Sequence, residues 1–93
     1  MVAKLLTVDL LIPGCSSLKE KRYVLSSLKT KLRRKFNVSV AEIDYHNKWQ
    51  RSRIAACTVG VDRKTVDGCC DKVIGFIERD YRVEITETFQ EYC

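Results

Sequence analysis

The feature of this 93-residue sequence that most clearly suggests a chemical role is a cluster of positive charge. Between Lys19 and Lys35 there are eight lysines and arginines but only one acidic residue, Glu20, so the segment carries +7 while the whole chain carries +5. The remaining residues are slightly negative, and the basic character is therefore local. Such an asymmetry is typical of a small domain that binds an anionic partner, most often a nucleic acid.

Four of these cations, together with Ser26, are three or four residues apart and would form one continuous row along a helix. We call this row the basic ridge, and its cations are Lys19, Arg22, Lys29 and Arg33. Like charges at these spacings destabilise an isolated helix, which favours a ligand-binding role over simple solvation. From the whole segment we predict nucleic-acid contacts by Lys19, Lys21, Arg22, Lys29, Arg33 and Arg34.

A second candidate site is the tip of a predicted hairpin, where residues 45–51 are rich in aromatic and basic side chains. Rings can stack on unpaired bases while Lys and Arg hold the phosphates. From this segment we predict Lys48, Trp49 and Arg51 as nucleic-acid contacts. The sequence favours a packing role for Trp49 at the root of a hairpin, in which case only its two basic neighbours would contact RNA.

Residues suited to catalysis are sparse. No phosphate-binding loop, dinucleotide-binding motif or nucleophile–histidine pair is present. Asp9 in the first strand resembles the metal-binding aspartate of small ferredoxin-like nucleases, but no motif places a second carboxylate near it. The five cysteines include no C-x-x-C pair and fit small buried apolar residues in a reducing compartment. We therefore predict no catalytic residue, no metal site and no cofactor.

Hydrophobic periodicity predicts the elements that position these side chains. Ser17 with Glu20 three residues later marks the start of one helix, and Asp62 caps another. The expected helices are 18–36 and 63–80, and the expected strands are 2–12, 37–45, 49–61 and 82–92.

The order βαββαβ on so short a chain predicts a single domain, residues 1–93, with an α+β ferredoxin-like fold. Its antiparallel sheet would have the strand order 4-1-3-2, with both helices on one face. The start of the first helix, the hairpin and the link before the last strand would then meet at one end of the sheet. The first basic residues of the helix, Lys19, Lys21 and Arg22, would lie there beside the hairpin.

The sheet face without helices should also be apolar, because Leu5 and Leu11 have the opposite parity to the core positions of the first strand. We expect a second copy of the chain or another protein to cover this face. No apolar run approaches the ~20 residues of a membrane span, and no signal segment precedes the first strand. These observations predict a cytoplasmic protein without membrane contact.

Three segments, residues 17–22 (SLKEKR), 36–42 (FNVSVAE) and 49–51 (WQR), resemble the YlxP family of small bacterial proteins of unknown function. The resemblance covers essentially the whole chain. It implies a ferredoxin-like fold and, because the family's genes commonly lie beside those for translation initiation and ribosome-binding factors, a role near RNA or ribosome maturation. It implies no catalytic residue. This chain has His46-Asn47-Lys48 where the family pattern has an acidic residue before the tryptophan, so its hairpin is more basic.

Three functions follow as hypotheses. The first is a non-enzymatic RNA-binding or ribosome-associated accessory factor whose partner is RNA or a ribosomal subunit. The second is a dimeric protein-interaction module that pairs through the helix-free sheet face. The third is a metal-dependent nuclease centred on Asp9.

Overall fold

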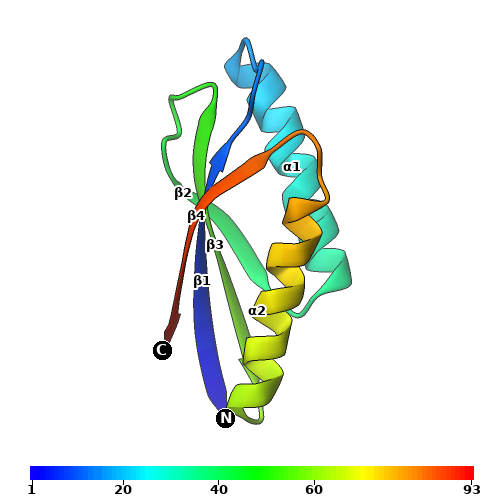
Figure 1. Ribbon diagram of the computed structural model, residues 1–93, viewed down its shortest axis with the longest axis vertical. Coiled ribbons are helices and arrows are strands. Elements are labelled where there is room, and N and C mark those ends of the chain that lie inside the picture. The colour runs from blue at the N-terminus through cyan, green and yellow to red at the C-terminus, as the bar shows by residue number, and fades with distance from the viewer.

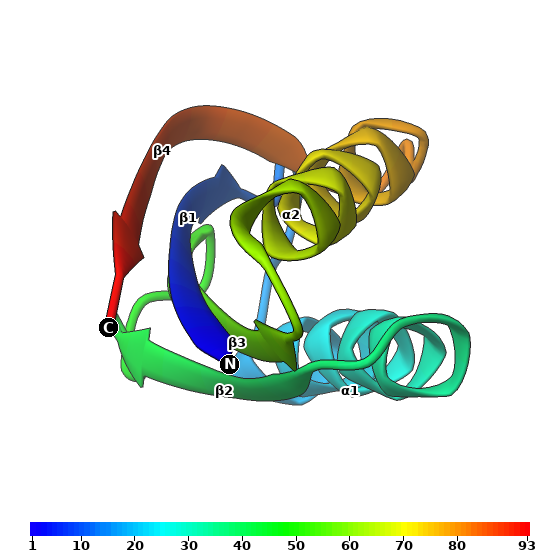
Figure 2. The ribbon, with the colours of Figure 1, turned by 90° about the horizontal axis from the view of Figure 1, so that it is seen from below.

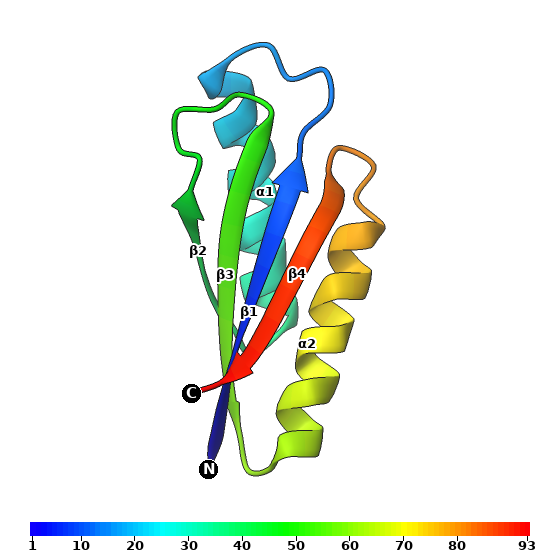
Figure 3. The same cartoon turned by 60° about the vertical axis from the view of Figure 1, so that its left-hand side comes forward.

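The computed structural model describes residues 1–93. Its elements, in chain order, are β1 (Val2–Leu11), α1 (Leu18–Lys35), β2 (Ser39–Asp44), β3 (Arg51–Gly60), α2 (Arg63–Glu78) and β4 (Glu84–Tyr92). The strands form one antiparallel sheet in the order β2-β3-β1-β4, and both helices cover the same face (Figure 1; Figure 3). The predicted α+β ferredoxin-like fold and strand order are confirmed.

The hydrophobic core lies between the helices and the curved sheet. Figure 2 shows α1 beside β2 and α2 beside β1 and β4. Alternate residues of β1 are fully buried against the helices, and Ile12, just after the strand, continues the same row; these residues are Leu6, Val8, Leu10 and Ile12. The helices contribute their apolar stripes, with Val24, Leu25, Leu28 and Leu32 from α1 and Val66, Cys70, Val73 and Ile77 from α2. Burying each of the large aliphatic side chains stabilises the fold by roughly 1.5–3 kcal/mol.

Both helices begin where the capping residues predict. Ser17 Oγ accepts a hydrogen bond from the Glu20 backbone N–H at 3.1 Å, and Asp62 Oδ1 accepts one from the Thr65 N–H at 2.9 Å. The reciprocal half of the predicted capping box differs, because the Glu20 carboxylate accepts from the backbone N–H and hydroxyl of Ser16 instead of Ser17. Neither helix is long and apolar enough to cross a membrane.

The connection between β2 and β3 is longer than predicted. The strands end at Asp44 and resume at Arg51, so the link is residues 45–50 and not the three residues 46–48. Tyr45 stops β2 because its backbone adopts a left-handed φ of 64°, and Lys48 N–H then donates to the Tyr45 carbonyl at 3.0 Å to close a turn. Trp49 therefore lies in the link and not in a strand.

The last strand also starts later than predicted, at Glu84 instead of Arg82. Asp80 holds a turn at this point, because its carboxylate accepts from the backbone N–H and from the guanidinium of Arg82. Arg82 also donates to Ser27 Oγ at 3.3 Å, in the middle of α1. The link before the last strand lies at the predicted end of the sheet, because Glu84 pairs with Leu11 at the end of β1, but its Arg82 contacts the middle of α1 and not the start of that helix.

Candidate nucleic-acid interface

The basic ridge lies on the flank of α1 that faces the β2 edge of the sheet. Arg33 Nη2 donates to the Val40 carbonyl of β2 at 2.7 Å, which fixes the side of the helix on which the ridge lies. The other ridge cations are exposed or half-exposed, and none of the five ion pairs in the structure includes a ridge residue. Arg34, in the last turn of α1, is also exposed. The ridge thus leaves most of its cations without an acidic partner.

Lys21 does not belong to this surface, and its prediction as a nucleic-acid contact is wrong. Its side chain is 2% exposed, and its Nζ lies 2.6 Å from the Tyr45 carbonyl and 3.1 Å from Glu42 Oε2. The same Glu42 oxygen accepts from Ser52 Oγ at 2.6 Å. Lys21 therefore anchors the first turns of α1 to the end of β2, and its ammonium cannot reach an external phosphate.

The link between β2 and β3 lies beside the start of α1, as predicted. Besides the contact of Lys21 with Tyr45, the Gln50 side-chain amide donates to the Cys15 carbonyl at 3.1 Å, which joins the link to the segment before α1. Lys48 and Trp49 in this link are exposed. The start of the ridge, at Lys19 and Arg22, and the link consequently lie at the same end of the molecule, while Arg33 lies near the start of β2.

Trp49 is not a core residue. Its side chain is 51% exposed and helps to line an open hollow of about 430 Å³ that the link residues form. The prediction that it packs at the root of the hairpin is wrong, because the hairpin root lies at Asp44 and Arg51 and the indole lies outside it. A tryptophan that is half exposed can offer a surface on which a base stacks.

Arg51 is placed where the sequence predicts, at the end of the link, but its guanidinium already lies over a ring. Its Cζ is 4.3 Å from the centroid of Tyr45, close enough for a cation–π contact. The residue is exposed, so the outer edge of the guanidinium remains accessible. The sequence pattern did not indicate that Tyr45 turns back over β3, because that depends on its left-handed backbone.

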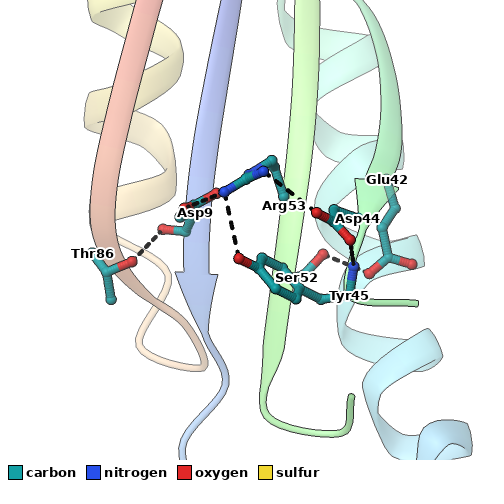
Figure 4. Close-up of polar contacts among 7 residues, drawn as sticks. All are labelled: Asp9, Glu42, Asp44, Tyr45, Ser52, Arg53 and Thr86. Atoms are coloured by element: carbon teal, nitrogen blue, oxygen red, sulfur yellow. Dashed lines mark hydrogen bonds and ion pairs between the residues drawn. The ribbon is translucent and has the colours of Figure 1, made fainter. Parts of the chain in front are cut away.

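Asp9 lies on the helix-free face of the sheet and is fully engaged by Arg53 (Figure 4). Arg53 Nε donates to Oδ1 at 2.6 Å and Nη2 donates to Oδ2 at 3.1 Å, while Tyr45 and Asp44 lie on the other side of the guanidinium. These hydrogen bonds lower the pKa of Asp9, although its burial works in the opposite direction. Asp9 is thus ionised and paired, and no group of three or more His, Cys, Asp and Glu in the structure could hold a metal ion.

The helix-free face has an apolar centre beside this charged end. Leu5 on β1 lies between Cys57 on β3 and Glu91 on β4, and Thr7 lies between Ala55 on β3 and Phe89 on β4. Phe89 is 54% exposed. The predicted apolar face is therefore present, although Thr7 and the Asp9–Arg53 pair interrupt it.

Together, the fold and this surface define a small α+β protein with a ferredoxin-like topology and a basic helix edge. Residues 4–89 match a protein family described as "Protein of unknown function (DUF503)". The chain is 36% identical over 84 residues to "Uncharacterized protein YlxP" of Bacillus subtilis (strain 168), covering 90% of this chain and 91% of that protein. The chain belongs to this family, as its sequence motifs predict.

Proposed function

We propose that the protein is a non-enzymatic, RNA-binding accessory factor that contacts RNA through the basic ridge of α1 and the adjacent link. One observation carries this proposal: Lys19, Arg22 and Lys29 are accessible cations on one helix flank with no acidic partner. Lys and Arg rows that neutralise phosphates supply most of the affinity of sequence-independent RNA binding. The exposed Trp49 beside them offers a stacking surface for an unpaired base.

The electrostatic setting supports the same proposal. Arg34 extends the positive surface at the end of α1, and Lys48 and Arg51 extend it at the other end. Arg33 is less available than its neighbours, because one of its nitrogens is bound to the Val40 carbonyl. A ribosomal subunit as the source of the RNA is part of the proposal, and it comes from the family resemblance.

Replacing Lys19 and Lys29 with glutamine should weaken RNA binding and make it less dependent on salt. Each lost phosphate contact reduces the slope of log affinity against log salt by roughly 0.7 on single strands, so the pair should reduce it by about 1.4. Fluorescence anisotropy with a labelled single-stranded RNA, titrated at several salt concentrations, measures both effects.

The matched control for this pair replaces Lys64 and Lys72 with glutamine, since these are two exposed lysines of α2 away from the ridge. That variant has the same net charge as the ridge variant, but its slope of log affinity against log salt should stay close to the wild-type value. An equal change in both variants would mean that overall charge, not the ridge, governs binding, and a normal slope in the ridge variant would refute the proposed surface.

We propose as a second candidate function that two copies of the chain pair through their helix-free sheet faces. The specific observation is the apolar centre formed by Leu5, Cys57, Ala55 and Phe89 on a face that no helix covers.

If the faces pair, Phe89→Asp should convert a dimer to a monomer in analytical ultracentrifugation at micromolar concentration. A charge at the centre of an apolar interface would be desolvated without a partner, which strongly opposes association. The control is Tyr81→Asp, which changes an exposed aromatic residue on the helix side of the molecule. A wild-type protein that sediments as a monomer would exclude this candidate.

A further inference from the structure

A cavity of about 410 Å³ lies between the C-terminal parts of α1 and α2 and the turn that leads to β4. Its walls carry three cations from two helix ends, Lys31, Lys35 and Arg79, and two aromatic rings, Phe76 and Tyr81. Lys31 and Lys35 belong to the flank of α1 that faces α2, opposite to the basic ridge, whose Arg33 faces β2. The positive charge of α1 is thus divided between two separate surfaces.

The remaining charges in the cavity wall cancel each other. The Asp80 carboxylate accepts two hydrogen bonds from the Arg82 guanidinium, at 2.9 and 2.7 Å, and is largely buried. Lys31, Lys35 and Arg79 take part in none of the ion pairs in the structure. The two helix C-termini together contribute about one negative charge, which leaves the cavity with a net charge of about +2.

The two aromatic rings of the cavity differ in how freely a ligand can reach them. Phe76 is fixed by an edge-to-face contact with Phe36, with centroids 5.9 Å apart, and Lys35 Nζ lies 5.2 Å from its centroid. Tyr81 at the rim is 94% exposed, so its ring is available to a ligand. A fully exposed aromatic ring beside unpaired cations is suited to a flat base attached to a phosphate.

We propose that this cavity binds a single phosphate-bearing nucleotide, with the phosphate held by Lys31, Lys35 and Arg79 and the base stacked on Tyr81. The volume falls in the lower part of the roughly 300–1,000 Å³ range of small-molecule sites, which is enough for one nucleotide. The nucleotide is either free or the 5′-phosphorylated end of an RNA. This site is distinct from the basic ridge and does not depend on it.

The test uses the full chain, uniformly labelled with ¹⁵N, and titrates it with AMP, adenosine, and a short RNA carrying either a 5′-phosphate or a 5′-hydroxyl group. AMP should shift the backbone amide signals of Phe76, Tyr81 and Arg82, whereas adenosine should not at the same concentration. If the 5′-phosphorylated RNA shifts these amides and binds more tightly than AMP, whereas the 5′-hydroxyl RNA leaves them unshifted, the ligand is an RNA end. If AMP binds at least as tightly, the ligand is a free nucleotide.

The deciding variants are two matched lysine pairs on the same helix. Lys31→Gln with Lys35→Gln should weaken AMP binding at least about tenfold, because contacts between cations and phosphate are charge-assisted. Lys19→Gln with Lys29→Gln should leave AMP binding unchanged. The proposal is overturned if neither AMP nor the phosphorylated RNA shifts these amides, or if both pairs weaken binding equally. A loss of RNA affinity in the ridge pair alone leaves this site intact and bears only on the proposed function.

Discussion

Lys21→Met is expected to lower the free energy of unfolding by about 3–5 kcal/mol, the cost of leaving a buried charge without its partner. The Lys21 ammonium lies 3.1 Å from Glu42 Oε2 and 2.6 Å from the Tyr45 carbonyl, and almost none of it reaches solvent. Without it, Glu42 keeps only its hydrogen bond from Ser52. The total free energy of unfolding of a small domain is only about 5–15 kcal/mol, so this variant should be barely stable.

Urea denaturation followed by circular dichroism measures this loss. Lys19→Met, two residues earlier and on the exposed ridge, is the control and should change stability by less than about 0.5 kcal/mol. Adding Glu42→Gln to Lys21→Met should recover part of the loss, because the unpaired carboxylate is then absent while Ser52 keeps an acceptor. If Lys21→Met unfolds at the wild-type urea concentration, the buried pair does not hold α1 to β2.

Arg53→Met should destabilise the protein by about 3 kcal/mol near neutral pH, at the lower end of the range for buried pairs because the Arg53 side chain is 30% exposed. It removes both hydrogen bonds to the Asp9 carboxylate, which is 8% exposed. Arg51→Met on the same strand is the control. It loses an exposed contact with the Tyr45 ring and a weaker charge interaction with Asp9, and it should cost about 1 kcal/mol or less.

The pH dependence gives this prediction a second measurement. The Arg53 hydrogen bonds hold the pKa of Asp9 below its ordinary value of 3.8. A lowered pKa contributes stability that is complete above the unfolded value and is lost as the pH falls through the folded value. The difference in unfolding free energy between the wild type and Arg53→Met should therefore shrink below about pH 4. A difference that stays constant down to about pH 2 would show that Asp9 and Arg53 are not coupled.

Local sequence patterns were sufficient to predict the fold. The capping residues Ser17 and Asp62 mark both helix starts, and the two parities of β1 separate the core face from the free face. Only one link joins two strands directly, and it is short enough for a hairpin. The strand order then followed from the preference for right-handed crossovers. The end of β2 before Tyr45 could not be predicted, because it depends on the left-handed backbone of that residue. The start of β4 after Arg82 could not be predicted either, because it depends on a turn in which the Asp80 side chain accepts a hydrogen bond from the Arg82 N–H.

The candidate site was less predictable, because the sequence shows which residues are charged but not which oppositely charged groups they contact in the fold. Lys21 is three or four residues from Val24 and Leu25, so its spacing placed it on the buried stripe, but the run of basic residues suggested a surface role. The pairing of Asp9 with Arg53 depends on the register of β1 with β3, which no local pattern specifies. Likewise, Lys31 and Lys35 form a cavity with Arg79 only through the packing of the two helices.

The hydrogen bond from Arg33 to the Val40 carbonyl has a further consequence for how copies of this protein can associate. Val40 lies in β2, one of the two edge strands, and its carbonyl is no longer free to template an incoming strand. The opposite edge, β4, exposes Glu84, Glu87 and Glu91, whose like charges oppose pairing with another copy of itself. The engaged carbonyl of β2 and the like charges of β4 both oppose edge-to-edge growth, so assembly through the open face would stop at a closed pair.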